Sequence, residues 1–137
     1  ESFANSAYYF HKANNLKNEN ITLLREGNIF RYTKQYDSCI YYLNKALWMA
    51  QERKDTSLLA LTHNYKGNVY ISQGYIQNAK HEALKALRLL KEKAPCVKVM
   101  VGGAVLTQEY ADMIHADFYS KDAMGSVYYA QRLFGKE

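Results

Sequence analysis

Residues 39–47 read CIYYLNKAL and residues 79–87 read AKHEALKAL, forty positions further along the chain. An internal repeat of this length is the signature of stacked structural units, each of which is too small to bury its apolar face alone. A partial third copy precedes them, because residues 8–13 resemble residues 41–46. The shift of 40 residues superimposes the identical pairs Thr22/Thr62, Gly27/Gly67, Asn28/Asn68, Lys45/Lys85, Ala46/Ala86, Leu47/Leu87 and Glu52/Glu92.

Each full copy carries two helical patterns. In its second half, apolar or small residues recur at i, i+4, i+7, i+8 and i+11, which places them on one face of a helix. Gly27 and Gly67 fall inside the first helix of each copy, where Gly costs about 1 kcal/mol relative to Ala. We interpret both glycines as points of close helix approach. Asp55 supplies an N-cap and Pro95 ends the last helix. The patterns predict helices over residues 20–33, 36–53, 57–73 and 75–93.

The composition is typical of a single soluble and mainly helical globular chain. It has 137 residues, of which 48% are hydrophobic, with seven Gly and one Pro. A single Pro leaves few forced helix breaks. No apolar run approaches the roughly 18 residues that a membrane span needs, so we expect that the chain is not an integral membrane protein. Its expected location, by default, is the cytoplasm. The first residue is not Met, which suggests that the chain begins inside a longer protein.

The charge is unevenly distributed along the chain. Residues 1–94 hold 14 Lys and Arg against eight Asp and Glu, whereas residues 95–137 hold four against five. The cations of the basic part are scattered singly among acids, so we expect a solvated surface and no nucleic-acid binding. Cys39 and Cys96 lack the spacing of a metal or redox pair and are interpreted as free thiols. The four His are dispersed, and no metal site is predicted.

The order of small and aromatic residues in the repeat resembles the tetratricopeptide repeat family over residues 1–94. The family repeat is about 34 residues long. The 40-residue spacing here therefore implies longer helices or a longer turn around residues 51–56. The family's early Trp is missing, and its closing Pro is represented only by Pro95. The residues that carry the resemblance are Gly27, Phe30, Cys39 and Ala46, then Gly67, Tyr70, Ala79 and Ala86.

Stacked helix hairpins turn the first helix of each pair toward a concave groove, where we expect the binding residues. The equivalent amides of Asn28 and Asn68 would hold an extended peptide by paired donor and acceptor bonds. Arg25 and Arg31 would clamp a carboxylate. The alternative interpretation is an ordinary solvated helix surface. The predicted inward residues are Leu24, Arg25, Asn28, Arg31 and Tyr32, then Leu61, Asn64, Tyr65, Asn68 and Ser72.

The periodicity changes after Pro95. A short β-branched run ends at Gly102 and Gly103, Thr107 can cap a helix, and Gly135 closes the last one. The order βαβα is the unit of a parallel sheet. Two strands alone are not a stable sheet, so this segment either packs on the last repeat helix or pairs with a second chain. The pattern predicts strands over residues 97–101 and 116–119 and helices over residues 108–114 and 121–134.

Residues 97–112 read VKVMVGGAVLTQEYAD, and residues 116–123 read ADFYSKDA. This text resembles the closing half of the cobalamin-binding domain of methionine synthase and related corrinoid methyl carriers, from about residue 89 to the C-terminus. The family's cobalt-ligating His, in an Asp-x-His-x-x-Gly turn, has no counterpart here. The resemblance implies half of a flavodoxin-like unit. It places Gly102, Gly103 and Ala104 beside the cofactor's nucleotide tail, flanked by Tyr119 and Ser120.

The sequence therefore predicts a mainly α chain with two parts. Residues 1–94 form tetratricopeptide-like hairpins that bind a protein or peptide, and residues 95–137 form a βαβα segment that caps them or makes a homodimer. No nucleophile elbow, phosphate loop or carboxylate pair is present, so no enzyme and no cofactor are expected. One alternative is a cobalamin-binding methyl-transfer component completed by a partner chain. Another is a natural or engineered fusion without a native task.

Overall fold

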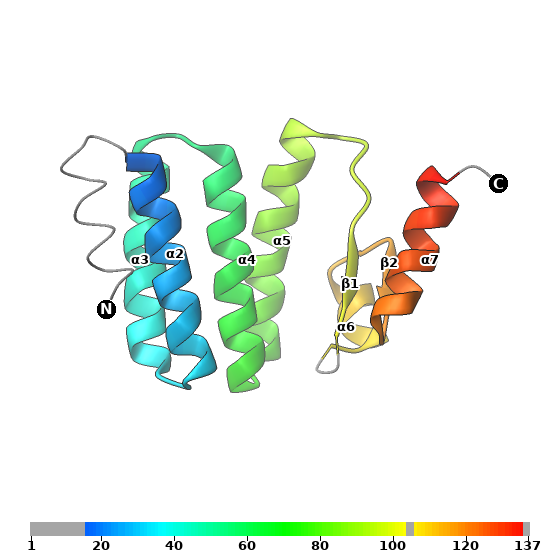
Figure 1. Cartoon of the computed structure of the whole chain (residues 1–137), viewed down its shortest axis with the longest axis horizontal. Coiled ribbons are helices and arrows are strands. Elements are labelled where there is room, and N and C mark those ends of the chain that lie inside the picture. Colours follow the sequence, from blue (N-terminus) through cyan, green and yellow to red (C-terminus); the bar gives the residue numbers. More distant parts are fainter. Residues whose placement is uncertain (1–15, 104–105, 136–137) are drawn as a thin grey trace. The chain divides into compact units, whose positions relative to one another are not determined.

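The structure is a computed structural model that describes residues 16–103 and 106–135. The partial repeat copy at residues 8–13 and the predicted cofactor residue Ala104 lie outside the described residues. The described part is mainly helical with one small parallel sheet, which confirms the mainly α prediction (Figure 1). The chain divides into two compact units, Glu1–Pro95 and Cys96–Glu137, and each is described by itself.

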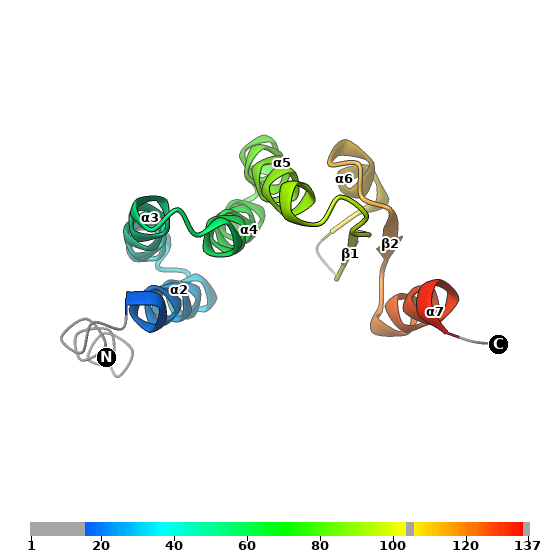
Figure 2. The same cartoon turned by 90° about the horizontal axis from the view of Figure 1, so that it is seen from above.

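The first unit is built from helix hairpins. Helix α2 packs on α3 and α4 packs on α5, and both α2 and α3 also contact α4 (Figures 1 and 2). The short turns make the two helices of each hairpin antiparallel. Within residues 16–95 the helices are α2 (Leu16–Tyr32), α3 (Tyr36–Glu52), α4 (Thr56–Gln73) and α5 (Ile76–Lys93).

Local backbone chemistry fixes where these helices end. Gly74 follows α4 with a φ of 82°, a left-handed conformation that Gly adopts without strain. The repeat-equivalent Lys34 has a φ of 62°, so the same turn geometry recurs with a different residue. Asp55 caps α4 as predicted, because its Oδ1 accepts a hydrogen bond of 3.1 Å from the Leu58 N–H. Helix α5 ends at Lys93, two residues before Pro95.

The main core of the first unit lies between α2, α3 and α4. Cys39 is fully buried in it, as the repeat pattern predicted. Burial raises the pKa of the Cys39 thiol to about 11, although the Arg31 charge acts in the opposite direction. The thiol therefore stays protonated and acts as a small apolar side chain. The core consists of Leu23, Leu24, Cys39, Leu43, Ala46, Met49 and Val69.

The two helix glycines face the partner helix of their own hairpin. A Cβ on Gly27 would lie 3.1 Å from Cδ2 of Leu43 and 3.4 Å from the carbonyl oxygen of Cys39. A Cβ on Gly67 would lie 3.6 Å from the carbonyl oxygen of Ala79, which is ordinary van der Waals contact. The predicted close approach is therefore confirmed at Gly27, whereas the space at Gly67 would accept a methyl group.

The second unit has the element order β-α-β-α. The strands are parallel, and Met100 of β1 pairs with Phe118 of β2. Both strands are shorter than predicted, and each lies further along the chain. The Val99 N–H donates to the Asp117 carboxylate at 2.8 Å rather than to a strand, so regular pairing begins later. The elements are β1 (Met100–Gly102), α6 (Gln108–Met113), β2 (Phe118–Ser120) and α7 (Ala123–Phe134).

Stacked rings and helix caps hold the second unit together. The rings of Phe118 and Tyr129 stack with centroids 4.3 Å apart. Thr107 caps α6 as predicted, since its Oγ1 accepts from the Tyr110 N–H at 3.1 Å. The Asp122 carboxylate accepts from the N–H of Gly125 at 2.9 Å, which makes Asp122 the N-cap and starts α7 two residues later than predicted. Among the described residues, no helix is long and apolar enough to cross a membrane.

Candidate peptide-binding surface

Several predicted groove residues form one polar network where α2 meets α4. The Nε of Arg31 donates to Oδ1 of Asn28 at 3.0 Å, and an N–H of the same guanidinium donates to Oγ of Ser72 at 3.3 Å. The Ser72 hydroxyl in turn donates to the backbone carbonyl of Asn68 at 3.1 Å. The guanidinium also lies over the Tyr32 ring, 4.4 Å from its centroid.

The network changes the role expected of the two arginines. A guanidinium has five N–H donors, and Arg31 uses donors on internal acceptors from both helices. It therefore links α2 to α4 through the Ser72 hydroxyl. Arg25 is exposed, six residues before Arg31 on α2. The predicted joint clamp thus consists of one hydrogen-bonded guanidinium and one exposed side chain.

The other predicted groove residues divide between surface and core. Asn64 is exposed, Asn68 is half-buried, and Tyr32 has 71% of its surface exposed. Tyr65 packs against the main core, so only part of its ring is available to a ligand. Leu24 was predicted to face the groove, and this is wrong, because it is 1% exposed and lies among core side chains.

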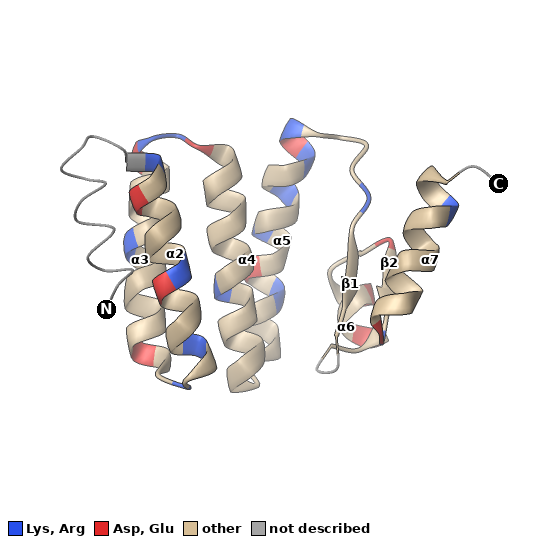
Figure 3. Cartoon of the chain, in the orientation of Figure 1, with Lys and Arg blue, Asp and Glu red and all other residues tan. Residues whose placement is uncertain are grey.

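Helix α2 carries both acidic and basic positions (Figure 3), but its exposed charged side chains are cations. Lys17 and Arg25 are exposed, and Arg31 is half-buried. The carboxylates of α2, Glu19 and Glu26, are both buried. Helix α4 has no acidic residue within its length. The described part of this surface therefore favours a negatively charged ligand.

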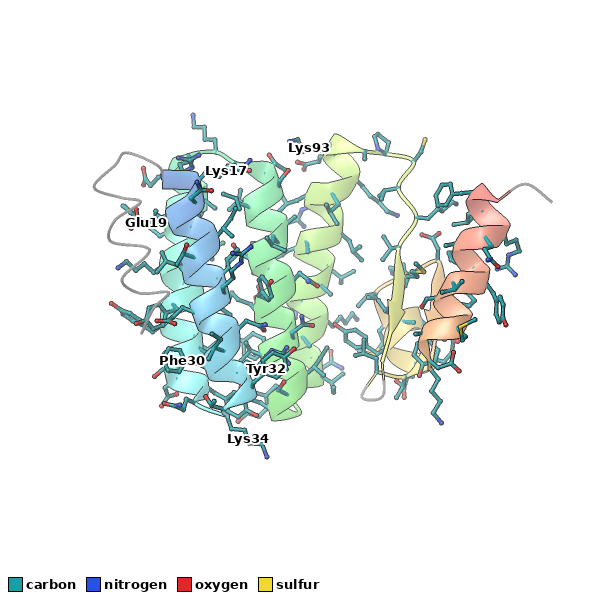
Figure 4. All side chains as sticks on the ribbon, viewed as in Figure 1. Lys17, Glu19, Phe30, Tyr32, Lys34 and Lys93 are labelled. Carbon is teal, nitrogen blue, oxygen red and sulfur yellow. The ribbon has the colours of Figure 1, made fainter. Side chains whose placement is uncertain are left out.

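A shallow pocket of about 390 Å³ opens next to the Arg31 network. The hydroxyl of Tyr36, in its wall, donates to the backbone carbonyl of Ser72 at 3.5 Å. Figure 4 shows Tyr32 and Lys34 at this end of the helices and Lys17 at the opposite end. The sequence did not reveal the pocket, because it joins the α2–α3 turn to the distant end of α4. It is lined by Lys34, Gln35, Tyr36, Asp37, Ser38 and Gln73.

A second polar contact, which sequence analysis missed, joins α4 to α5. Nδ1 of His63 lies 2.8 Å from Oε1 of Glu82, and both side chains are nearly buried. Burial raises the pKa of Glu82, but the hydrogen bond from His63 and the charges of Lys66 and Lys85 outweigh it and leave the pKa lowered. The first hairpin has Leu23 and Tyr42 at the equivalent positions. A comparison of the two repeat copies would therefore have shown that a polar pair replaces them in the second hairpin.

Replacing Glu82 by Gln is expected to make the free energy of unfolding depend less on pH in the acid range. A group whose pKa is lowered by folding stabilises the fold above its ordinary pKa of 4.5 and loses that contribution as the pH falls through the folded value. Glu82→Gln should also lower the free energy of unfolding at neutral pH by about 1.5–3 kcal/mol, the range for a hydrogen bond to a charged group. Urea unfolding at several pH values from 7 downward measures both effects.

The control for this experiment is Glu92→Gln, which removes the same charge from an exposed position on the same helix. Its acid dependence should match that of the unchanged protein, because a solvated carboxylate gains little on folding. If the free energy of unfolding fell equally steeply with pH in Glu82→Gln and in the unchanged protein, the His63–Glu82 contact would not contribute to acid sensitivity.

Two of the predicted cofactor residues of the second unit, Gly102 and Ser120, contact each other. A Cβ on Gly102 would lie 2.8 Å from the carbonyl oxygen of Ser120, so Gly102 is required by strand pairing itself. The Ser120 hydroxyl donates to the backbone carbonyl of Asp122 at 2.6 Å, and the Tyr119 hydroxyl donates to the carbonyl of Leu106 at 2.7 Å. Gly103 has a φ of 123°, which favours Gly for conformational reasons alone.

These contacts do not fit the role that the cobalamin resemblance implies. The space beside Gly102 is filled by Ser120, and both hydroxyls that would flank a nucleotide tail already bond within the unit. The N-terminus of α7 is capped by the carboxylate of Asp122, which disfavours a phosphate there. The described residues of this unit are explained by their own packing.

No family model, curated protein or solved structure matches this chain. Over residues 16–103 and 106–135, no group of three or more His, Cys, Asp or Glu side chains could hold a metal ion. The function is therefore inferred from the surface of α2 and α4, where the cations and amides gather.

Proposed function

We propose that the chain is a non-enzymatic binding protein that holds an acidic, extended segment of another protein along α2 and α4. The supporting observation is the combination of Arg25 and the Arg31 network with a surface whose carboxylates are buried. An extended segment would bond the amides of Asn64 and Asn68, while its carboxylates meet the guanidinium groups. Tyr32, mostly exposed beside Arg31, would cover apolar parts of the segment.

Within this proposal, the first unit has the tetratricopeptide arrangement and the second is half of a flavodoxin-like unit. The 40-residue repeat and the packing of α2 on both α3 and α4 support the former. The second unit would serve as a cap or as a dimerisation element, because a sheet of two short strands needs further cover. Free thiols at Cys39 and Cys96 suit a reducing compartment such as the cytoplasm.

The proposal is tested by peptide binding to the full chain. The probe is a fluorescein-labelled decapeptide of alternating Glu and Ser, and its control is the decapeptide of alternating Lys and Ser. Fluorescence anisotropy should show binding of the Glu peptide only. Arg25→Glu should weaken it by about tenfold or more, since it places like charges together at an exposed position where folding is unaffected.

The matched control is Lys45→Glu, which makes the same charge change at an exposed position of α3, outside the proposed surface. Its affinity for the Glu peptide should stay within about twofold of that of the unchanged protein, which allows for screened long-range attraction. Equal affinities for Arg25→Glu and the unchanged protein would reject the α2–α4 surface as the binding site. Equal losses of affinity in both variants would show that the peptide is held by the overall charge of the protein and not by this surface.

A further inference from the structure

The second helices of the two hairpins, α3 and α5, differ in what covers them. Ala50 of α3 is fully buried, whereas its repeat equivalent on α5, Leu90, is 41% exposed. Helix α4 contacts α3, and its Tyr65 and Val69 join the core that α3 lines. The repeat ends with α5, because the sequence after Pro95 does not continue it. The face of α5 that corresponds to the covered face of α3 thus lacks a repeat helix.

This face of α5 combines an apolar stripe with cations. Ile76, Ala83, Leu87 and Leu90 follow the spacing i, i+7, i+11 and i+14, which aligns them along the helix, and Ile76 is 40% exposed. Lys80 and Lys91 lie beside the stripe by the same spacing. At the position of Lys80 the first hairpin has Ile40, which packs against the core. A helix that covered this face of α5 would therefore meet a cation where α4 meets the apolar side chain of Ile40.

The charges of α5 are strongly one-sided. Its cations are Lys80, Lys85, Arg88, Lys91 and Lys93. Its carboxylates are Glu82, which is buried against His63, and Glu92. A second copy of the same helix would meet like charges along its length, which disfavours self-association through this face.

We propose that α5 binds an amphipathic helix of a partner protein with acidic residues beside its apolar stripe, in the place on α5 that α4 takes on α3. A helix is expected because α4 occupies the equivalent face of α3, and acidic residues are expected because cations lie beside the apolar stripe of α5. This site uses neither α2 nor the predicted groove residues, so it goes beyond the proposed function and does not depend on it.

The test uses the full chain and two synthetic helical peptides derived from α4. Both peptides have the sequence of residues 56–73, and both keep Tyr65 and Val69. In one the exposed residues Leu61, Asn64 and Ser72 are replaced by Glu, and in the other they are replaced by Lys. Fluorescence anisotropy should show that the Glu peptide binds at least about tenfold more tightly, that salt weakens it, and that its helical circular dichroism rises on binding.

Three variants locate the site. Lys80→Glu combined with Lys91→Glu should weaken the Glu peptide by about tenfold or more and improve the Lys peptide. Lys45→Glu, an exposed charge reversal on α3, should change neither by more than about twofold. Arg25→Glu should leave this peptide unaffected while it weakens the extended Glu and Ser decapeptide, so that failure of one proposal is distinguishable from failure of the other.

Several results would overturn the α5 site. Absence of binding, equal affinity for the two peptides, or equal losses in the α5 and Lys45 variants would each do so. Protection of Leu90→Cys from a maleimide in the free chain would show that the protein covers this face itself. Tighter retention by phosphatidylserine vesicles or by a double-stranded DNA oligonucleotide, lost in the α5 variant, would assign the face to those ligands instead.

Discussion

Leu24→Ala is expected to lower the free energy of unfolding by about 2–5 kcal/mol, the range for removing a fully buried Leu from a core. Leu24 is 1% exposed and lies in the cluster that joins α2, α3 and α4. The substitution leaves a cavity, and the surrounding helices can move only partly to fill it because other contacts hold them. Because a domain of this size is stable by about 5–15 kcal/mol in total, the loss should be plain in urea unfolding monitored by circular dichroism.

The comparison is Leu61→Ala, at a position also predicted to face the groove. Leu61 is 38% exposed, so its truncation should cost less than about 1 kcal/mol. If Leu24→Ala lowered the free energy of unfolding as little as Leu61→Ala does, Leu24 would not be a core residue of the first hairpin. The pair therefore separates core from groove on the same two helices.

Gly67→Ala is expected to stabilise the protein, whereas Gly27→Ala is not. Each substitution gains about 1 kcal/mol of helix propensity. At Gly67 the added methyl meets its nearest neighbour, the carbonyl oxygen of Ala79, at 3.6 Å, so the gain should remain as a higher melting temperature. At Gly27 the methyl would lie 3.1 Å from Leu43, and overpacking of about 1–3 kcal/mol should cancel or exceed the gain.

Thermal unfolding of both variants beside the unchanged protein measures this difference. The double variant Gly27→Ala with Leu43→Ala serves as a control, because removing the crowded side chain should make the methyl at position 27 less costly than it is beside Leu43. If both single variants were stabilised equally, α2 and α3 would not be in close contact at Gly27. The packing of the first hairpin would then need revision.

The four long helices could be predicted from the sequence because their signals are local. Periodic apolar residues, the Asp55 cap and the stop before Pro95 each act within one or two helical turns. Predicted ends differ from the observed ends by at most a few residues. The start of β1 was predicted three residues too early, because it depends on the Asp117 side chain, which accepts the N–H of Val99 from a distant part of the chain.

The candidate surface was predictable only in part. Asn28, Arg31 and Asn68 could be placed on one face by the repeat, but their mutual hydrogen bonds depend on how closely α2 approaches α4. The burial of Leu24 and Tyr65 could not be read from spacing, since the groove stripe and the core stripe are adjacent on each helix. The His63–Glu82 pair is visible only as an exchange between the repeat copies.

The sequence by itself determined the helices, the repeat that stacks them and the division near Pro95, because periodicity, capping and backbone restriction are properties of neighbouring residues. Tertiary structure alone decided which polar groups pair with each other and which glycine is needed for space. Those outcomes depend on distances between helices, which packing sets to within a few tenths of an ångström and which no local pattern specifies.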